Sequence, residues 1–222
     1  MHKNTYRAVI FDMDGTLLDT IDDIADSMNG ALKRMGYPSH PIRSYLNFVG
    51  EGIEVLAMRS LPEKDRTTET ISRAVTYMRE EYSTRWGDKS RPFEGIPEAL
   101  DGLAGRGVSM SILSNKLDSF TKAMAAALLP DWRFDEVRGL THDCPRKPDP
   151  AGAWLCAERM GVDPGQCVFV GDSGIDMETA VRAGMAPFGV LWGYQDSDRL
   201  LAGGAQVLMH EPGELLGFFQ SG

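Results

Sequence analysis

The feature that most constrains the fold of this chain is a series of short apolar runs that end abruptly in polar residues. Three runs are clear, at 6–11, 108–113 and 168–170, and Asp, Ser or Gly-Asp follows each of them. Short apolar runs with such boundaries are typical of buried strands. Weaker runs at 136–140 and 187–191 are further strand candidates.

Helical patterns lie between these runs. They cover residues 96–103, 117–129, 150–160 and 175–183, and the last two end at a glycine. Strands that alternate with helices predict parallel strands joined by right-handed crossovers. The predicted fold class is therefore α/β, with a doubly wound parallel sheet.

The stretch from 18 to 91 breaks this alternation. Apolar residues at helical spacing predict long helices near 21–35 and 71–82, and a shorter one is expected over 51–61. No convincing strand stands out there. We therefore expect an inserted all-helical cap domain. The predicted domains are an α/β core of residues 1–17 and 92–222 and a cap of residues 18–91.

Composition limits the partners that the protein can have. The net charge of −9 disfavours nucleic acids and anionic membranes, because both attract basic surfaces. The longest apolar run has seven residues, 123–129, whereas a membrane span needs about 20. Cys144, Cys156 and Cys167 form no C-x-x-C pair, which favours reduced thiols. We expect a cytoplasmic protein, monomeric or homodimeric, without nucleic-acid or membrane partners.

Four aspartates follow two of the predicted strands. Asp12 and Asp14 lie in a D-x-D-G-T-L-x-D string, and Asp172 and Asp176 follow the run at 168–170. Alone, the first pair is compatible with a turn and the second with helix capping. Ligands of open parallel sheets bind beyond the carboxyl ends of the strands. Four acids that converge there need a cation, and oxygen-only ligands favour Mg²⁺.

Two further polar residues occupy similar positions. Lys147 lies in the segment Arg-Lys-Pro-Asp-Pro, whose prolines make the backbone stiff before a helix. A solvated surface lysine is the alternative interpretation. Ser114 follows the run at 108–113, where a hydroxyl is also a common turn or capping residue.

Taken together, these segments resemble the four sequence motifs of the haloacid dehalogenase superfamily. They occur in the expected order and cover nearly the whole chain, with the helical insert after the first motif. The turn 49–52 and the segment 190–194 are similar to the phosphoglycolate phosphatase branch of that family. The four motif segments are Asp12-Met13-Asp14-Gly15-Thr16-Leu17, Ser114-Asn115-Lys116, Lys147-Pro148-Asp149-Pro150 and Gly171-Asp172-Ser173-Gly174-Ile175-Asp176.

The resemblance implies roles for these residues. Asp12 is expected to be the nucleophile and a magnesium ligand. Asp14 is expected to be the general acid–base, with its backbone carbonyl on the metal. Ser114 and Lys147 are expected to hold the phosphoryl oxygens.

The remaining implied roles concern the metal and the substrate. Asp172 is expected to bind Mg²⁺ directly, and Asp176 to support it through water or Lys147. Asn115 is expected to orient the phosphoryl group or the substrate. Further expected substrate-binding residues are Thr16, Gly50 and Gly52.

The activity expected from the resemblance is magnesium-dependent hydrolysis of a small phosphate monoester through an aspartyl-phosphate, with 2-phosphoglycolate favoured. Pyrophosphatase, nucleotide phosphatase, sugar-phosphate mutase and a non-catalytic phosphate-binding regulator remain alternatives. Asp14 argues against halide chemistry, because dehalogenases of the superfamily lack the second aspartate. Specificity is expected to come from the cap, and the sequence does not choose among its basic residues Arg43, Arg59, Lys64 and Arg66.

Overall fold

The structure is a computed structural model that describes residues 6–220. The chain forms two compact units. We call Met1–Leu18 with Pro92–Gly222 the α/β unit, and Asp19–Arg91 the helical unit. These units divide at 18/19 and 91/92, whereas the predicted domains divide at 17/18 and 91/92. The assignment of the helical unit as a substrate-covering cap domain stays a prediction.

The α/β unit contains a six-stranded sheet in the order β5-β4-β1-β6-β7-β8. Every neighbouring pair is parallel, which confirms the predicted fold class. From β1 at its centre, the chain adds β4 and β5 on one side and β6 to β8 on the other. The strands are β1 Ala8–Phe11, β4 Ser109–Leu117, β5 Glu136–Leu140, β6 Cys167–Gly171, β7 Ala186–Val190 and β8 Val207–Met209.

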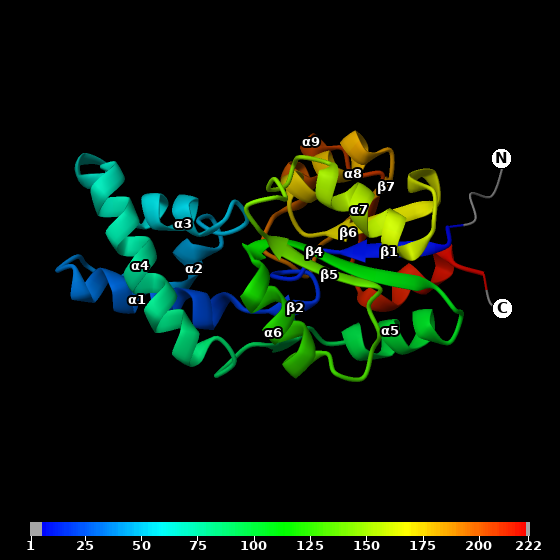
Figure 1. Cartoon of the computed structure of the whole chain (residues 1–222), viewed down its shortest axis with the longest axis horizontal. Helices are drawn as coiled ribbons and strands as arrows, with labels where there is room; N and C mark the ends of the chain where they lie inside the picture. The colour runs from blue at the N-terminus through cyan, green and yellow to red at the C-terminus, as the bar shows by residue number, and fades with distance from the viewer. Residues whose placement is uncertain (1–5, 221–222) are drawn as a thin grey trace. The chain divides into compact units, whose positions relative to one another are not determined.

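Helices cover both faces of this sheet (Figure 1). Helices α7, α8 and α9 lie on one face, while α5, α6 and the C-terminal 3₁₀ helix η3 lie on the other. The core includes Ala8 and Ile10 of β1 and Phe169 of β6, packed against α7 and α8. The helices are α5 Ile96–Ala104, α6 Asp118–Leu128, α7 Ala151–Met160, α8 Gly174–Ala183 and α9 Ser197–Gly203, with 3₁₀ helices η2 Pro164–Gln166 and η3 Pro212–Phe218.

The five strands predicted for this unit are present, with ends shifted by a few residues. The largest shift is in β4, which continues through 114–117 after a change of register against β5. The structure adds β8, with three residues, and α9, with seven. Neither is long enough to show a clear apolar period.

The helical unit is built around α1 Ile21–Arg34 and α4 Thr68–Arg85, which pack together. Shorter helices are α2 Ile42–Tyr45, α3 Ile53–Ser60 and the 3₁₀ helix η1 Glu63–Asp65. At the unit boundary, β2 Leu18–Asp19 pairs with β3 Arg91–Pro92. The expectation of no strand in 18–91 therefore needs a small correction, because two-residue strands show no pattern in a sequence.

Two further expectations concern the cysteine thiols and membrane-spanning segments. The three cysteines are free and buried, and burial raises the pKa of Cys156 to about 12 and that of Cys167 to about 11. Within the part of the chain that is described, none of the helices has both the length and the apolar character to cross a bilayer.

Candidate active site

The site begins directly after the central strand. Asp12 follows β1, and its N–H donates to Val170 O on β6 at 2.9 Å. The chain then turns sharply at Gly15, which has φ +86°. A Cβ at this position would lie only 2.3 Å from Asp172 Oδ2, so the turn needs glycine for its conformation and for its close approach. The turn thus brings the Asp12 and Asp172 segments together.

Three carboxylates meet at this edge of the sheet. Asp12, Asp172 and Asp176 each offer an oxygen, and these oxygens lie within 4.8 Å of one another. The three residues are 8%, 3% and 0% exposed. Buried like charges this close repel unless a cation lies between them. Carboxylate oxygens are the ligands that Mg²⁺ prefers, so the donor set fits a hard divalent cation.

Lys147 is the positive charge of the site. Its Nζ lies 2.7 Å from Asp12 Oδ1 and 2.6 Å from Asp176 Oδ1, and the residue is 4% exposed. Asn115 holds the backbone of Lys147, since Asn115 Oδ1 accepts from Lys147 N at 2.8 Å and Asn115 Nδ2 donates to Lys147 O at 3.3 Å. The alternative of a solvated surface lysine does not describe this residue.

The electrostatics explain why these groups need one another. Burial raises the pKa of Asp12 to about 7, against the opposing effect of Lys147, and the charge of Asp176 adds to the rise. Burial and the charges of Asp176 and Asp12 also raise the pKa of Asp172 well above its usual range. Burial alone would lower the pKa of Lys147, but Asp12 and Asp176 raise it above its ordinary value. The site therefore favours binding of further positive charge.

Asp176 is both a helix-capping residue and a member of the carboxylate group. Ser173 is the N-cap of α8, and Asp176 Oδ2 accepts from Ser173 N at 3.0 Å and from Ser173 Oγ at 2.5 Å. This capping box orients the other carboxylate oxygen, Oδ1, toward Lys147. Asp172 is oriented from the segment 190–194, because its Oδ2 accepts from Tyr194 N at 2.8 Å.

Asp14 lies close to this group without being part of it. Its carboxylate is not among the three that cluster, and both of its oxygens lie 2.9 Å from Lys116 Nζ. The predicted metal contact of Asp14 through its backbone carbonyl stays a prediction. Lys116 was given no role from the sequence, although a lysine at a strand end, two residues after Ser114, is a signal that could have been used.

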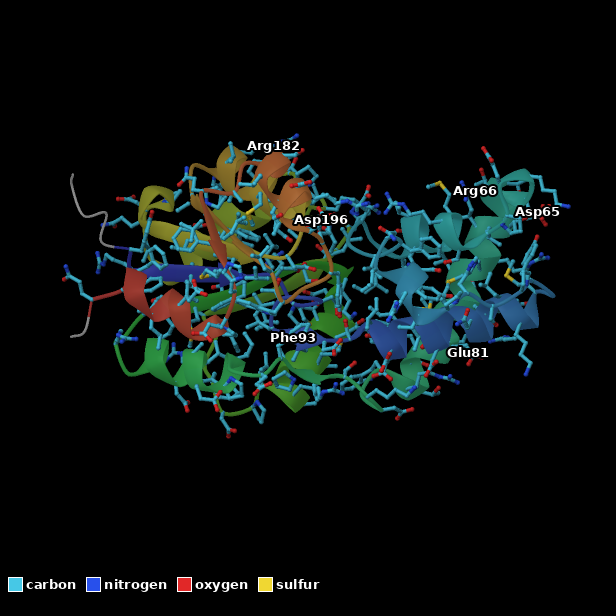
Figure 2. All side chains as sticks on the ribbon, turned by 180° about the vertical axis from the view of Figure 1, so that it is seen from behind. Asp65, Arg66, Glu81, Phe93, Arg182 and Asp196 are labelled. Carbon is cyan, nitrogen blue, oxygen red and sulfur yellow. The ribbon has the colours of Figure 1, made fainter. Side chains whose placement is uncertain are left out.

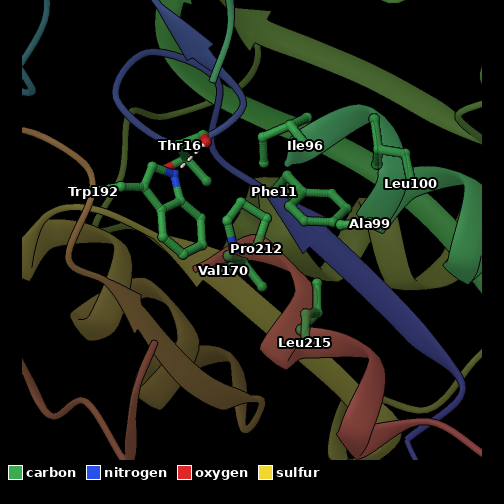
Figure 3. Close-up of a pocket in the computed structure, with 9 residues that line it drawn as sticks. All are labelled: Phe11, Thr16, Ile96, Ala99, Leu100, Val170, Trp192, Pro212 and Leu215. Atoms are coloured by element: carbon green, nitrogen blue, oxygen red, sulfur yellow. Dashed lines mark hydrogen bonds between the residues drawn. The ribbon is translucent and has the colours of Figure 1, made fainter. Parts of the chain in front are cut away.

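The other residues predicted for the α/β unit are buried. Ser114 is 4% exposed, and its Oγ accepts from Lys116 N at 3.2 Å. Thr16 is fully buried and lines a small apolar pocket (Figure 3), where its backbone oxygen accepts from Trp192 Nε1 at 3.0 Å. Asn115 is occupied by Lys147. Substrate contacts by Thr16 and Asn115 stay predictions.

The residues predicted for the cap lie in the helical unit. Gly50 and Gly52 lie directly before α3 and have φ +103° and +89°, which glycine tolerates best. Arg59 is paired with Glu51 and donates to Phe48 O at 3.5 Å, so it braces the same turn. Arg66, labelled in Figure 2, donates from Nε to Leu61 O at 3.1 Å. The other two basic candidates, Arg43 and Lys64, are exposed.

Comparisons with known proteins agree with this arrangement. The family model for haloacid dehalogenase-like hydrolases matches residues 9–190, and the chain belongs to this family. Phosphoglycolate phosphatases of Nitrosospira multiformis and Aquifex aeolicus are 33% and 30% identical to it. The alignments cover 86% and 85% of this chain and 85% and 86% of the relatives. A crystal structure from Lactobacillus delbrueckii subsp. bulgaricus has a TM-score of 0.90 at 29% identity, covering 96% of this chain and 97% of that chain.

Proposed function

We propose that this protein is a cytoplasmic, magnesium-dependent phosphatase that hydrolyses small phosphate monoesters, with 2-phosphoglycolate as its preferred substrate. The observation that carries the proposal is the buried group of Asp12, Asp172 and Asp176 with Lys147 between two of them, in a haloacid dehalogenase-like frame. The substrate assignment is supported by relatives that are phosphoglycolate phosphatases at about one third identity.

In this mechanism Asp12 attacks the phosphorus atom and forms an aspartyl-phosphate, while the bond to the leaving oxygen breaks. Asp14 gives a proton to the departing alkoxide and then takes a proton from the water that attacks the aspartyl-phosphate. Lys147 and Ser114 hold phosphoryl oxygens. A bound Mg²⁺ would be held by Asp12, Asp172 and the backbone carbonyl of Asp14, with Asp176 supporting it through water or Lys147. It would offset the negative charge that Asp12 and the phosphate bring together.

Several effects must act together in such a site. Rate enhancements for phosphate monoesters reach about 10²¹, which corresponds to about 28 kcal/mol, whereas a single positioned donor supplies about 3–4 kcal/mol. Covalent catalysis by Asp12, proton transfer by Asp14 and charge stabilisation by Lys147 and the cation share that requirement.

The proposal is tested by a phosphate-release screen over some dozens of phosphorylated metabolites, with magnesium and with a chelator. We expect release from 2-phosphoglycolate above other small esters, and its loss with the chelator. Faster release from pyrophosphate or nucleotides would reassign the substrate. Isomerisation of a sugar phosphate without net release would indicate a mutase, and binding of Mg²⁺ without any turnover would indicate a non-catalytic protein.

A further inference from the structure

Lys116 makes a contact that the proposed chemistry does not explain. It lies near the carboxyl end of β4, and its side chain is 9% exposed. Its ammonium lies 2.9 Å from both carboxylate oxygens of Asp14, which is 102 residues away in the chain. A lysine side chain loses much rotamer freedom when it is ordered, so a buried lysine in one geometry needs a compensating interaction. Its partner is the residue to which proton transfer is assigned.

The end of β4 is shaped to make this contact. The register against β5 shifts between Leu113 and Leu117, and such irregularities redirect side chains. The three residues of the irregular segment then serve different partners. Asn115 bonds to the backbone of Lys147, Ser114 accepts from the backbone of Lys116, and the side chain of Lys116 extends to Asp14.

The backbone of Asp14 is already fixed by its own turn. Gly15 N donates to Leu18 O at 2.9 Å, and Asp14 forms an isolated bridge with Leu18. The direction of the carboxylate is then decided by its two side-chain torsions. Contact of one ammonium with both carboxylate oxygens restrains these torsions.

We propose that Lys116 is a positioning residue for the proton transfers of Asp14, an inference that rests on the proposed phosphatase function. When Asp14 carries a proton, one carboxyl oxygen still accepts from Lys116 and the other directs its O–H at the leaving oxygen. The proton moves to the alkoxide as the P–O bond breaks, and the resulting carboxylate later takes a proton from the attacking water. Lys116 keeps its own proton and charge throughout.

The test compares leaving-group release in the first turnover for two esters. The alkoxide of 2-phosphoglycolate needs a proton as it departs, whereas para-nitrophenolate leaves without one. We expect Lys116→Met to slow release from 2-phosphoglycolate about 10- to 100-fold, within the range of general acid catalysis and misplacement effects. Release from para-nitrophenyl phosphate should change less than about 3-fold. An equal loss for both esters would overturn the proposal, because a structural defect does not distinguish leaving groups.

Four further variants separate positioning from loss of fold. Lys122→Met removes an exposed lysine paired with Asp118 and is expected to leave both rates unchanged. Lys116→Arg keeps a charge that can contact both oxygens, and should keep the wild-type ratio between the esters. Asp14→Asn should reproduce the selective loss, and Lys116→Met added to it should cost no further activity. Additive losses in the double variant, or a changed ratio in folded Lys116→Arg, would contradict the proposal.

A separate outcome concerns the function on which this inference rests. If the wild-type protein with magnesium releases phosphate from neither ester, the proposed phosphatase function is wrong and the inference has no basis. If the wild type is active and only the selectivity of Lys116→Met is missing, the phosphatase function stands and the role of Lys116 is wrong.

Discussion

The two units treat their buried carboxylates in opposite ways. In the α/β unit, Asp12, Asp172 and Asp176 face one another, and burial raises the pKa of the first two. In the helical unit, Asp23 is 1% exposed, and its Oδ2 accepts from Lys89 N, Ser90 N and Ser90 Oγ at 3.0, 2.8 and 2.7 Å. Its negative charge is thus matched by three donors.

The two kinds of buried carboxylate have different consequences for the protein. A buried carboxylate with matching donors stabilises the fold, and Asp23 fixes the residues that precede β3 to the start of α1. Buried carboxylates that face one another repel, and this repulsion favours the binding of a cation among them. Elsewhere in the helical unit, Glu81, which is labelled in Figure 2, pairs with Arg34 and Arg85.

The largest expected effect comes from removing the nucleophile. Asp12→Asn should lower kcat/KM for 2-phosphoglycolate by about 10⁴-fold or more, as loss of a covalent nucleophile does in other enzymes. The matched variant Asp23→Asn, in the other unit, should keep kcat within a few fold at low temperature. Phosphate release measures both, and near-normal turnover by Asp12→Asn would contradict the mechanism.

Removal of the Asp23 carboxylate tests the comparison in the helical unit. Asp23→Ala leaves the N–H and hydroxyl of buried Ser90, and the N–H of Lys89, without their acceptor and should lower the free energy of unfolding by about 3 kcal/mol. Urea denaturation measures the change. Asp26→Ala, which removes an exposed partner of Lys89, is the control and should lose far less. Equal losses of unfolding free energy in the two variants would show that the burial of Asp23 and its three donors do not determine its contribution to stability.

At Asp172 we expect a substitution to raise the free energy of unfolding, whereas a substitution at Asp23 lowers it. Asp172→Asn keeps an acceptor for Tyr194 N and removes a buried charge whose pKa is raised. Without metal, its unfolding free energy should rise by about 1 kcal/mol, which is about 2–4 °C in Tm for a chain of this length. Magnesium, which should stabilise the wild type, should have little effect on the variant. A lower Tm of the metal-free variant would contradict the assignment of repulsion to this site.

The last predicted effect is a pH dependence of the metal-free protein. Folding raises the pKa of Asp12 from 3.8 to about 7, so the folded state binds more protons than the unfolded state between these values. Stability from this group is therefore present below about pH 4 and is lost as pH rises through 7, by about 1.4 kcal/mol per pH unit between these values. Thermal unfolding from pH 5 to 8 in a chelator should show this slope, and Asp12→Asn should lack much of it. Parallel slopes would exclude Asp12 as the cause.

Of the two kinds of buried carboxylate, only those of the α/β unit could be predicted from the sequence. Asp12, Asp172 and Lys147 were predictable because each follows a strand or precedes a helix, and parallel strands bring such positions to one edge. The α/β sheet was predictable because its buried strands are short apolar runs in the sequence.

The remaining features depend on pairing over long distances in the chain. Asp23 meets Ser90 67 residues later, and Lys116 meets Asp14 102 residues earlier. No local pattern marks either pair. Asn115 holds the backbone of Lys147, 32 residues later, through two hydrogen bonds, while its predicted contact with the substrate stays a prediction. The contacts of Arg59 with Phe48 O and Glu51, which hold the turn before α3, likewise could not be predicted from a single sequence.

The central claim is that Asp12 becomes phosphorylated during turnover, and trapping that species tests it most directly. Asp14→Asn should slow the attack of water, so acid quenching during turnover of para-nitrophenyl phosphate with magnesium should trap the aspartyl-phosphate. Mass spectrometry after peptic digestion should then find one phosphoryl group on the peptide that contains Asp12, removable by hydroxylamine. Turnover with the phosphoryl group on another residue, or with none on the protein, would contradict the account.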